Sequence, residues 1–483
     1  TGWAGYTLAR QLDAKIYRPI VISPRSYFVF TPLLASTSVG TLEFRTALEP
    51  VRSRRTSVEF VQGWADDVDF TNKTIMVEEA VDDPRQGLSL TGDAKAEQEA
   101  YPHRIPNPTF KGKTFQMKWD KLIIAVGCYS QTFGTPGVRE HALFLKDVGD
   151  ARRIRKKLLT CFETASLPTT SEEVRRHLLN FAIVGGGPTG IEFAAELHDV
   201  VKEDLAKVYP DLVKYCNITV YDVAPSVLPM FDEELSSYAM KTFRREGIKI
   251  KTSHHVENLR LGPPNQPKSL DTAAQRQCLT LKVEEEGELG VGMVVWSTGL
   301  MMNPFISKAL DRTFDLPETT HGEARPGPDT GHERLWKIKK QSKSGSIITD
   351  DRLRVLVQSK TDDAKSTVLQ DVYAIGDCAT TEGTSYPATA QVASQKAYWL
   401  AKRLNRGGFE RGGFNWKNAG TLAYIGSWRA IMQAGTGGHV SGRAAWIVWR
   451  GAYLTKSVSW RNKLLIPMYW VINWAFGRDI TRF

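Results

Sequence analysis

Short apolar runs that end in glycine or aspartate recur along this chain, and they predict buried strands. Such runs occupy residues 122–127, 181–184, 217–222, 294–299 and 371–377. Runs of this length, bounded by turn residues, are typical of strands inside a parallel sheet. Apolar positions at helical spacing over residues 191–197 predict an amphipathic helix shortly after the second run. The pattern indicates an α/β fold in which strands and helices alternate.

A glycine-rich turn joins the second predicted strand to this helix. Gly185, Gly187 and Gly190 fit the spacing G-x-G-x-x-G, and Pro188 lies between the last two. In such a turn the first glycine permits the sharp bend, the second lets the backbone approach a pyrophosphate, and the third lets helix and strand pack closely. The helix N-terminus then faces the phosphate charge. The turn therefore predicts a dinucleotide-binding unit in the middle of the chain.

Asp222 ends the next predicted strand and is the candidate ligand for the ribose hydroxyls of that dinucleotide. It lies further from the glycines than usual, and the extra length is accounted for by residues 200–215. A carboxylate at this place repels a 2′-phosphate, and residues 223–228 contain no arginine to attract one. The sequence therefore favours NADH over NADPH. The competing interpretation of Asp222 is an ordinary turn residue at a strand end.

A second nucleotide-binding unit is indicated at the start of the sequence. Gly2 and Gly5 have the mutual spacing of the second and third glycines of such a turn and lead into a helical pattern over residues 6–12. We expect that the first strand and first glycine of this unit are missing from the sequence, and that this fragment alone holds its cofactor poorly. Asp377 follows a later strand, and the strands ending at Gly127 and Gly299 are similar to the crossovers between the two nucleotide domains of flavoproteins. Four motifs in this order predict a flavoprotein with FAD and NADH sites.

Composition excludes several other classes. The 483 residues are 42% hydrophobic and 24% charged, which is ordinary for a globular protein of about three domains. The five cysteines, at 128, 161, 216, 278 and 378, form no C-x-x-C pair, so neither a disulfide framework nor a dithiol centre is predicted. His254 and His255 lack partners at zinc spacing, so no metal site is predicted. Residues 82–113, 262–277 and 317–346 are polar and rich in turn residues, and we expect surface loops there.

The C-terminal part combines tryptophan with positive charge, and much of the net charge of +10 gathers there. Six of the thirteen tryptophans lie at or beyond position 428, and no acidic residue occurs between residues 443 and 478. On one continuous helix Trp446, Trp449, Tyr453 and Trp460 form a stripe beside Arg443, Arg450 and Arg461. The apolar residues 464–476 are too few to cross a bilayer. We therefore predict a segment that lies on one leaflet; a core or dimer-interface segment is the alternative, and nucleic-acid binding is not expected.

Three longer segments resemble one family of flavoproteins. Residues 23–34 with 39–43, residues 387–395, and residues 422–427 with 476–479 closely resemble signature segments of the type II NADH dehydrogenases, the non-pumping NADH:ubiquinone oxidoreductases. The length and the polar insertions are most similar to fungal mitochondrial members. Two positions need comment: Ser23 replaces the acidic ribose ligand of a classical FAD domain, as in eukaryotic members, and Lys396 stands where bacterial relatives often have glutamine.

The resemblance implies an α/β fold of two Rossmann-like domains and a C-terminal membrane-anchoring α/β segment. It places the first part of the FAD-binding domain at residues 1–145, the NADH-binding domain at 146–299, the second FAD-binding part at 300–408, and a membrane-anchoring and dimerisation domain at 409–483. The expected FAD site comprises Gly2, Gly5, Ser23, Arg25, Thr31, Gly127, Asp377, Ala390, Gln391 and Val392. The expected NADH site comprises Gly185, Gly187, Pro188, Gly190, Asp222, Thr298 and Gly299.

The resemblance also implies the remaining chemistry and the partners. Residues 390–392 begin a predicted helix whose N–H groups would face negative charge on the flavin. Gln391 and Gln395 are expected to line a tunnel for ubiquinone, and Glu192 is a candidate proton relay; its alternative role is a first-turn glutamate favoured by the helix dipole. The family implies a homodimer peripheral to the mitochondrial inner membrane, and the sequence leaves the face open.

Two other functions use the same architecture. A sulfide:quinone oxidoreductase requires cooperating cysteines beside the flavin, for which Cys128 and Cys378 are the candidates, whereas the NAD turn with Asp222 argues against it. A signalling protein of the apoptosis-inducing type binds NAD and FAD but uses its redox state to control a partner. Fast steady oxidation of NADH by quinone distinguishes the enzyme from this second alternative.

Overall fold

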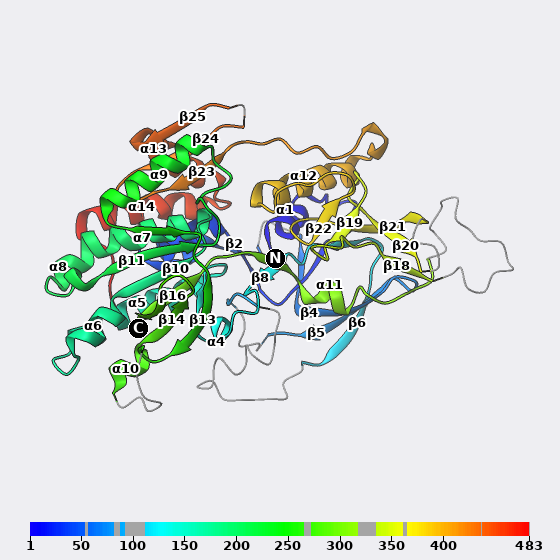
Figure 1. The fold of residues 1–483 in the computed structure, drawn as a ribbon. Coiled ribbons are helices and arrows are strands. Elements are labelled where there is room, and N and C mark those ends of the chain that lie inside the picture. Colours follow the sequence, from blue (N-terminus) through cyan, green and yellow to red (C-terminus); the bar gives the residue numbers. More distant parts are fainter. Residues whose placement is uncertain are drawn as a thin grey trace, which may run out of the picture.

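The computed structural model describes residues 1–53, 57–81, 87–91, 112–264, 272–316, 335–360, 365–435 and 437–482. Figure 1 shows two lobes side by side, with the C-terminal elements packed against one of them. Much of the three predicted surface segments lies outside the described residues. Two described parts of them are not loops, which corrects our expectation. Helix α10 (Ala273–Gln277) starts in a capping box made by Thr272 and Gln275, and strand β18 (Trp336–Ile338) pairs with β20.

The first lobe is built on a five-stranded sheet, and its three central strands are among the predicted ones. Every pair in it is parallel, and the apolar runs lie at its centre, as the absence of polar alternation predicts. In sheet order the strands are β12 (Lys249–Thr252), β11 (Asn217–Asp222), β10 (Asn180–Val184), β16 (Met293–Trp296) and β9 (Leu143–Phe144). An antiparallel sheet, β13 (Val256–Leu261), β14 (Leu279–Val283) and β15 (Gly287–Val291), belongs to the same lobe.

Helices α5 (Val148–Ser166), α7 (Pro188–Val200) and α9 (Glu233–Glu246) belong to the same lobe and contribute apolar residues to its core. Helix α5 begins in a capping box formed by Asp147 and Asp150, which satisfies its free N–H groups. Phe162 of α5 and Phe193 of α7 are fully buried in one continuous core. This core also takes in residues of the C-terminal part, so the first lobe and the C-terminal elements are packed as one unit.

The second lobe holds two further sheets. One has the order β1 (Ile20–Ser23), β4 (Glu59–Asp69), β5 (Thr74–Glu79) and β6 (Thr114–Lys118). The other has the order β22 (Ala379–Thr381), β19 (Ile347–Thr349), β20 (Arg354–Ser359), β21 (Ser366–Ala374) and β7 (Leu122–Ile124), with β18 also on β20. Helix α1 (Trp3–Gln11) packs against α12 (Ala390–Arg406), and both share a core with Tyr373 and Ile375 of the strand that leads to Asp377.

The C-terminal part forms a small antiparallel sheet and two helices. Strands β23 (Thr421–Tyr424), β24 (Ala430–Gln433) and β25 (His439–Gly442) precede α13 (Arg443–Lys456) and α14 (Trp460–Phe476). The predicted continuous aromatic stripe is wrong, because the helix breaks at residues 457–459 and places Trp460 on α14. Trp449 is buried against the core instead of facing outward. On α13 and α14 the exposed large apolar side chains are Ile447, Val448, Trp460, Leu464, Met468, Val471, Ile472, Trp474 and Phe476.

The remaining elements are short connections. The helical ones are η1 (Thr31–Leu33), α2 (Leu34–Ser38), η2 (Phe44–Ala47), α4 (Val138–His141), α6 (Glu172–Leu178), η3 (Val201–Leu205), α8 (Ala206–Val208), η4 (Val213–Tyr215), α11 (Pro304–Lys308) and η5 (Phe409–Arg411). The strands are β2 (Tyr27–Val29), β3 (Leu48–Pro50), β8 (Cys128–Ser130) and β17 (Leu300–Met302). Among them η3 continues α7 as a π-helical turn, which carries acidic residues beyond the end of α7.

Candidate nucleotide and flavin site

The three glycines between β10 and α7 have different surroundings. A Cβ on Gly190 would lie 2.0 Å from the carbonyl oxygen of Gly185, so only glycine lets the helix approach the turn this closely. Gly185 itself has a φ of +116°, a conformation that side chains rarely adopt. A Cβ on Gly187 would meet nothing within 4 Å, which leaves open space in front of the helix N-terminus. This geometry fits the predicted turn, with room for a pyrophosphate at Gly187.

Asp222 ends β11 beside this turn. Its carboxylate accepts hydrogen bonds from the backbone N–H groups of Gly186 and Ala224. The side chain is therefore held at the carboxyl edge of the parallel sheet, where nucleotides bind in doubly wound folds. Thr298 and Gly299, predicted for the same site, follow the adjacent strand β16, and Thr298 Oγ1 lies 3.5 Å from the carbonyl oxygen of Gln131.

The predicted FAD residues Gly2, Ser23, Arg25 and Thr31 gather near the start of α1. Thr1 Oγ1 lies 3.2 Å from Ser23 Oγ at the end of β1, and Trp3 Nε1 donates to Thr31 Oγ1 at 3.0 Å. Arg25 pairs with the buried carboxylate of Asp147 at 2.8 Å. Gly5 lies in the same helix, where a Cβ would lie 3.4 Å from Ala125.

Open space and a polar side chain identify where a flavin nucleotide would fit. A Cβ added to Gly2 or Gly127 would meet no atom within 4 Å. Asp377 follows β21, and its carboxylate accepts a hydrogen bond from the thiol of Cys128 at 3.3 Å. These residues fit FAD: the two glycines leave room for it, and Asp377 offers an acceptor for its ribityl or ribose hydroxyls.

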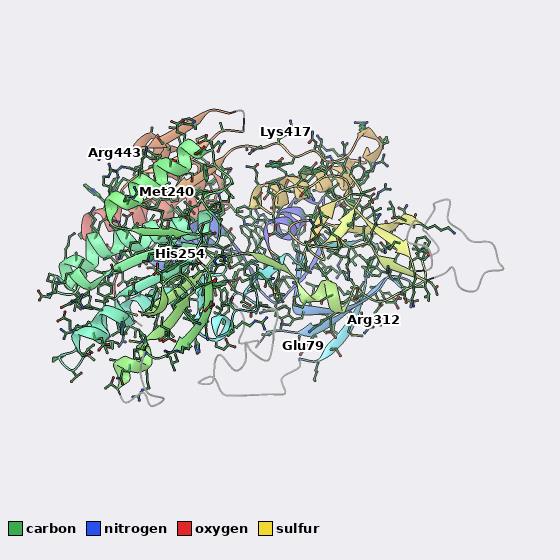
Figure 2. The ribbon with its side chains drawn as sticks, in the orientation of Figure 1. Glu79, Met240, His254, Arg312, Lys417 and Arg443 are labelled. Atoms are coloured by element: carbon green, nitrogen blue, oxygen red, sulfur yellow. The ribbon has the colours of Figure 1, made fainter. Side chains whose placement is uncertain are left out.

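Helix α12 begins beside these residues, with Thr389 as its N-cap and Ala390, Gln391 and Val392 in its first turn. Gln391 Oε1 accepts from the N–H groups of Trp416 (side chain) and Ala419 (backbone), at 2.9 and 3.1 Å, and its Nε2 donates to Gly420 O. The side-chain amides of both glutamines predicted to contact quinone thus form hydrogen bonds with one segment, residues 416–420. Figure 2 labels Lys417 on this segment, which passes from one lobe to the other.

Gln395 forms two hydrogen bonds with the backbone of Lys417. Its Oε1 accepts from Lys417 N at 3.0 Å, and its Nε2 donates to Lys417 O at 2.8 Å. A two-point pairing of this kind fixes the segment against α12. Sequence reasoning predicted a quinone contact for Gln391 and Gln395, and the structure adds an anchoring contact that was not expected.

Glu192 lies in the second turn of α7 and is 8% exposed. It is not a first-turn residue, so the alternative role as a glutamate favoured by the helix dipole is wrong. Its Oε1 accepts from Tyr424 N at 3.0 Å and from Trp449 Nε1 at 3.2 Å. Burial raises the pKa of Glu192 to about 7, against these two hydrogen bonds, which lower it. A carboxyl group with this pKa exchanges its proton readily near neutral pH.

Two further buried carboxylates follow Glu192 on the same face of α7, and sequence reasoning missed both. Glu196 accepts from Ser36 Oγ and Thr41 Oγ1, each at 2.7 Å, and burial raises its pKa. Asp199 accepts from the Tyr424 hydroxyl at 2.5 Å. The spacings of four and three residues were a visible signal, because acidic residues at those steps share one face of a helix.

The C-terminal residues Arg478 and Asp479 form ion pairs with helices of the first lobe. Arg478 Nη1 lies 2.6 Å from Asp204 and 2.7 Å from Glu203, and its Nε donates to Thr41 Oγ1 at 3.0 Å. Asp479 pairs with Arg155 of α5 at 3.4 Å. The end of the described chain is thereby tied to the helices of the first lobe.

Comparison with known proteins decides the family. A family model for pyridine nucleotide-disulphide oxidoreductases matches residues 1–315, and one for the NDH2 C-terminal domain matches residues 418–479. A Dictyostelium discoideum protein named probable NADH dehydrogenase is 35% identical, covering 100% of this chain and 90% of that protein. This chain belongs to the type II NADH dehydrogenase (NDH2) family. The mitochondrial external NADH-ubiquinone oxidoreductase 2 of Saccharomyces cerevisiae is 32% identical over 99% of this chain and 80% of its own length.

The fold agrees with this family. The structure of NDH2 from Plasmodium falciparum in complex with NADH superposes with a TM-score of 0.77 at 23% identity, covering 99% of this chain and 98% of that one. At this identity the likeness concerns the fold alone. The predicted fold class and family are confirmed.

Cys128 and Cys378 are the cysteines that the sulfide:quinone alternative would need in this NDH2 family member. Cys128 and Cys378 are both free and buried, and burial raises the pKa of each thiol to about 11. Since the thiolate is the reactive form, both are poor nucleophiles at neutral pH. This counts against the sulfide:quinone alternative, as the family assignment does.

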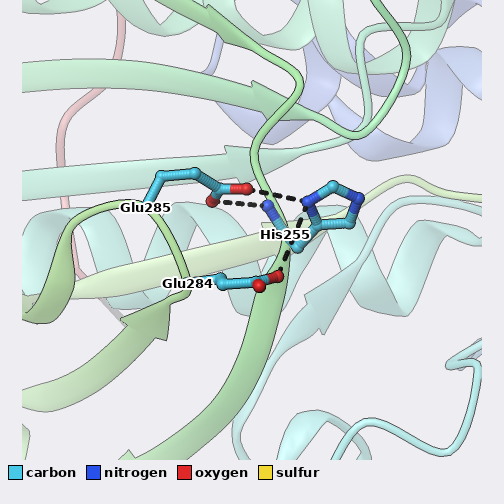
Figure 3. A group of neighbouring side chains, drawn as sticks. All are labelled: His255, Glu284 and Glu285. Atoms are coloured by element: carbon cyan, nitrogen blue, oxygen red, sulfur yellow. Dashed lines mark hydrogen bonds and ion pairs between the residues drawn. The ribbon is translucent and has the colours of Figure 1, made fainter.

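His255 is exposed on the first lobe, whereas its neighbour His254 donates its backbone N–H to the carbonyl oxygen of Asp222 at 3.0 Å. Figure 3 shows His255 with Glu284 and Glu285, whose ligand atoms lie within 4.8 Å of one another. His255 Nδ1 lies 2.8 Å from Glu285 Oε1, and this contact raises the pKa of His255 and lowers that of Glu285 to about 2. The group is exposed, and an ion pair accounts for its geometry.

Proposed function

We propose that this chain oxidises NADH and reduces ubiquinone at the surface of the mitochondrial inner membrane, with FAD between the two substrates and without proton pumping. The names of the relatives supply the acceptor and the organelle. One observation carries the proposal for this chain: Glu192, on the helix that begins at the NAD turn, is bound by Tyr424 and Trp449 of the C-terminal part. The nucleotide helix and the segment proposed to meet the membrane thus share a proton-exchanging group.

When bound, FAD accepts a hydride from NADH and passes both electrons to a quinone. The protein has to hold nicotinamide and flavin in contact. It also has to supply one proton, because NADH delivers the other hydrogen as hydride in the overall reaction NADH + H⁺ + Q → NAD⁺ + QH₂. Gly187 and Pro188 leave room for the nucleotide phosphates, and Asp222 accepts from the ribose hydroxyls. Asp377 and the first turn of α12 bound the flavin. Glu192 gives one proton to a quinone oxygen and regains it from solvent.

Asp222 also sets the donor preference in this proposal. Its carboxylate is held by the N–H groups of Gly186 and Ala224 at the place where a 2′-phosphate would lie in NADPH. The negative charges of the Asp222 carboxylate and of a neighbouring 2′-phosphate would repel each other. NADH is therefore the preferred donor, although several relatives are named NAD(P)H-ubiquinone oxidoreductases.

The membrane contact falls on α13 and α14. Trp474 is 74% exposed and Phe476 is 86% exposed, beside other outward apolar residues and the cations Arg461 and Lys463. Aromatic and aliphatic side chains flanked by cations suit the headgroup layer of one leaflet. No helix among the described residues is both long and apolar enough to cross a bilayer. A homodimer through the C-terminal part belongs to the same proposal.

Anaerobic stopped-flow absorbance tests the proposal directly. The FAD-loaded protein is mixed with NADH or NADPH and then with a short-chain ubiquinone. We expect bleaching by NADH and fast reoxidation by quinone. A long-lived reduced complex that quinone does not reoxidise would contradict the enzyme function and favour a signalling role.

Vesicle co-sedimentation tests the membrane contact separately. We expect the protein to bind vesicles containing anionic lipid, and the double variant Trp474→Ser/Phe476→Ser to bind at least tenfold more weakly. Equal binding of both proteins would refute the membrane contact at α14.

A further inference from the structure

Lys396 is a buried cation that the proposed mechanism does not use. It lies in α12 and is 2% exposed, in the company of the most deeply buried large side chains. Within the described part of the chain, the Lys396 ammonium group donates one hydrogen bond, to Thr381 Oγ1 at 3.4 Å. No carboxylate among those residues forms an ion pair with it. A buried ammonium without a close anion is costly, so its presence calls for a compensating charge.

The surroundings of Lys396 are aromatic and weakly polar. Its Nζ lies 5.5 Å from the ring centroid of Tyr386 and 6.0 Å from that of Phe414, which supply cation–π attraction. The charged and titratable groups that act on it are Cys378 and Asp377, both in the loop between β21 and β22. Burial lowers the pKa of Lys396 to about 8, and Asp377 and Cys378 act in the opposite direction. The side chain is therefore charged at neutral pH.

The position of Lys396 relates it to the flavin site. It is borne by α12, whose first turn bounds the site, and it reaches Thr381 of β22, four residues after Asp377. Its cation thus lies behind two of the elements that would hold the flavin. Methionine has a similar length and would fill this space without the free-energy cost of burying an ammonium group. The charge of Lys396 therefore calls for a role of its own.

We propose that Lys396 is a positioning residue that places a fixed positive charge behind the flavin and favours the reduced, more negative state of the bound cofactor. The inference rests on the FAD part of the proposed function and not on the quinone part. The physical reason is that a cation in a poorly solvated site lowers the free energy of added negative charge nearby. Lys396 acts through Asp377 and the α12 turn, and it does not touch the reacting atoms.

The test measures the midpoint potential of the bound flavin in the FAD-loaded protein, by anaerobic titration with a redox dye and no quinone. The variants are Lys396→Met, which keeps the length and removes the charge, and Lys396→Arg, which keeps the charge. Lys402→Met, at an exposed position of the same helix, is the matched control. We expect the equilibrium constant for reduction to fall about tenfold in Lys396→Met, which is about 30 mV for a two-electron couple. Lys396→Arg and Lys402→Met should stay close to the wild type.

A pH series covers the case in which Lys396→Met loses its FAD. Lysine discharges as the pH rises through about 8, whereas arginine stays charged. The potential of the wild type should therefore drop below that of Lys396→Arg between pH 7 and 10, by the same tenfold factor. An unchanged potential in flavin-loaded Lys396→Met, or parallel curves for wild type and Lys396→Arg, would overturn the inference. Failure of quinone reduction alone would affect only the proposed function.

Discussion

Trp449 of α13 donates its indole Nε1–H to Glu192 Oε1 of α7 at 3.2 Å, and both side chains are buried. The C-terminal part therefore does more than cover the first lobe, because it supplies a donor to the carboxylate beside the NAD turn. The second donor, Tyr424 N–H, comes from β23 of the same part. Both hydrogen bonds stabilise the ionised form of Glu192, whereas burial destabilises it. The balance places the pKa of Glu192 at about 7.

Replacing Glu192 by glutamine should slow the quinone half-reaction and spare the hydride step. Glutamine keeps an oxygen for Trp449 and Tyr424 but cannot donate a proton in turnover. Loss of a general acid typically costs at least 10²-fold. Stopped-flow measurement should therefore show flavin reduction by NADH within about twofold of the wild type, and reoxidation by quinone slower by about that factor. Glu196→Gln, one turn further along α7, is the control; an equal slowing there would remove the special role of Glu192.

The same variant should gain stability relative to the wild type as the pH rises from about 4.5 to about 7, and keep that gain at higher pH. The pKa of Glu192 is raised from 4.5 to about 7, so folding holds its proton more tightly than the unfolded chain does. Its contribution is favourable below pH 4.5 and is lost as the pH rises to about 7. At about 1.4 kcal/mol per unit, the loss reaches about 3 kcal/mol. The melting temperature of Glu192→Gln should match that of the wild type at about pH 4 and exceed it at about pH 8. Equal melting temperatures at the higher pH would argue against a raised pKa.

Asp222→Asn should weaken the preference for NADH. The N–H groups of Gly186 and Ala224 bind different carboxylate oxygens of Asp222, so asparagine keeps an acceptor for only one of them. The turn loses one hydrogen bond, and the repulsion of a 2′-phosphate is lost. We expect the ratio of kcat/KM for NADH to that for NADPH to fall about tenfold, which corresponds to about 1.4 kcal/mol. Steady-state assays with both donors measure it. Glu257→Gln, an exposed change on β13, should leave the ratio alone, and an unaltered ratio in Asp222→Asn would assign donor choice to another residue.

Arg478→Met should destabilise the attachment of the C-terminal part. The guanidinium pairs with Asp204 and Glu203, and its charge acts on Glu196. Removing one partner of a buried pair typically costs about 3–5 kcal/mol, because the other charge stays buried without compensation. Calorimetry should show a lower melting temperature, and limited proteolysis should cut the C-terminal helices sooner. Arg482→Met, at an exposed position nearby, should show neither effect.

Local patterns predicted the parts of the fold that depend on local chemistry. The turn at Gly185, Gly187 and Gly190 and the strand ending at Asp222 were predictable because spacing and apolar runs act over a few residues. The aromatic stripe was not, because a break at residues 457–459 turns α14 onto a new axis and leaves Trp449 inside. A run of tryptophans in the sequence does not show which of the rings pack into the core and which are exposed.

The spacing of the acidic residues on α7 was visible in the sequence, but their burial and their partners were not. Glu196 is satisfied by Ser36, 160 residues away, and Asp199 by Tyr424, 225 residues away. Their burial is created by segments that meet only in the folded chain. The sequence set Lys396 apart only from bacterial relatives, which often have glutamine there. The packing of Thr381, Tyr386 and Phe414 shows that it is enclosed.

The segment held by Gln391 and Gln395 has a structural consequence. It is fixed to α12 as far as Gly420, and β23 begins at the next residue and ends at Tyr424, whose N–H binds Glu192. The four residues of β23 therefore connect the segment held by α12 to the N–H group that binds Glu192 of α7. The hydrogen bond to Glu192 is thus only a few residues of chain away from the contacts of Gln391 and Gln395, so the two helices α7 and α12 share one short connection.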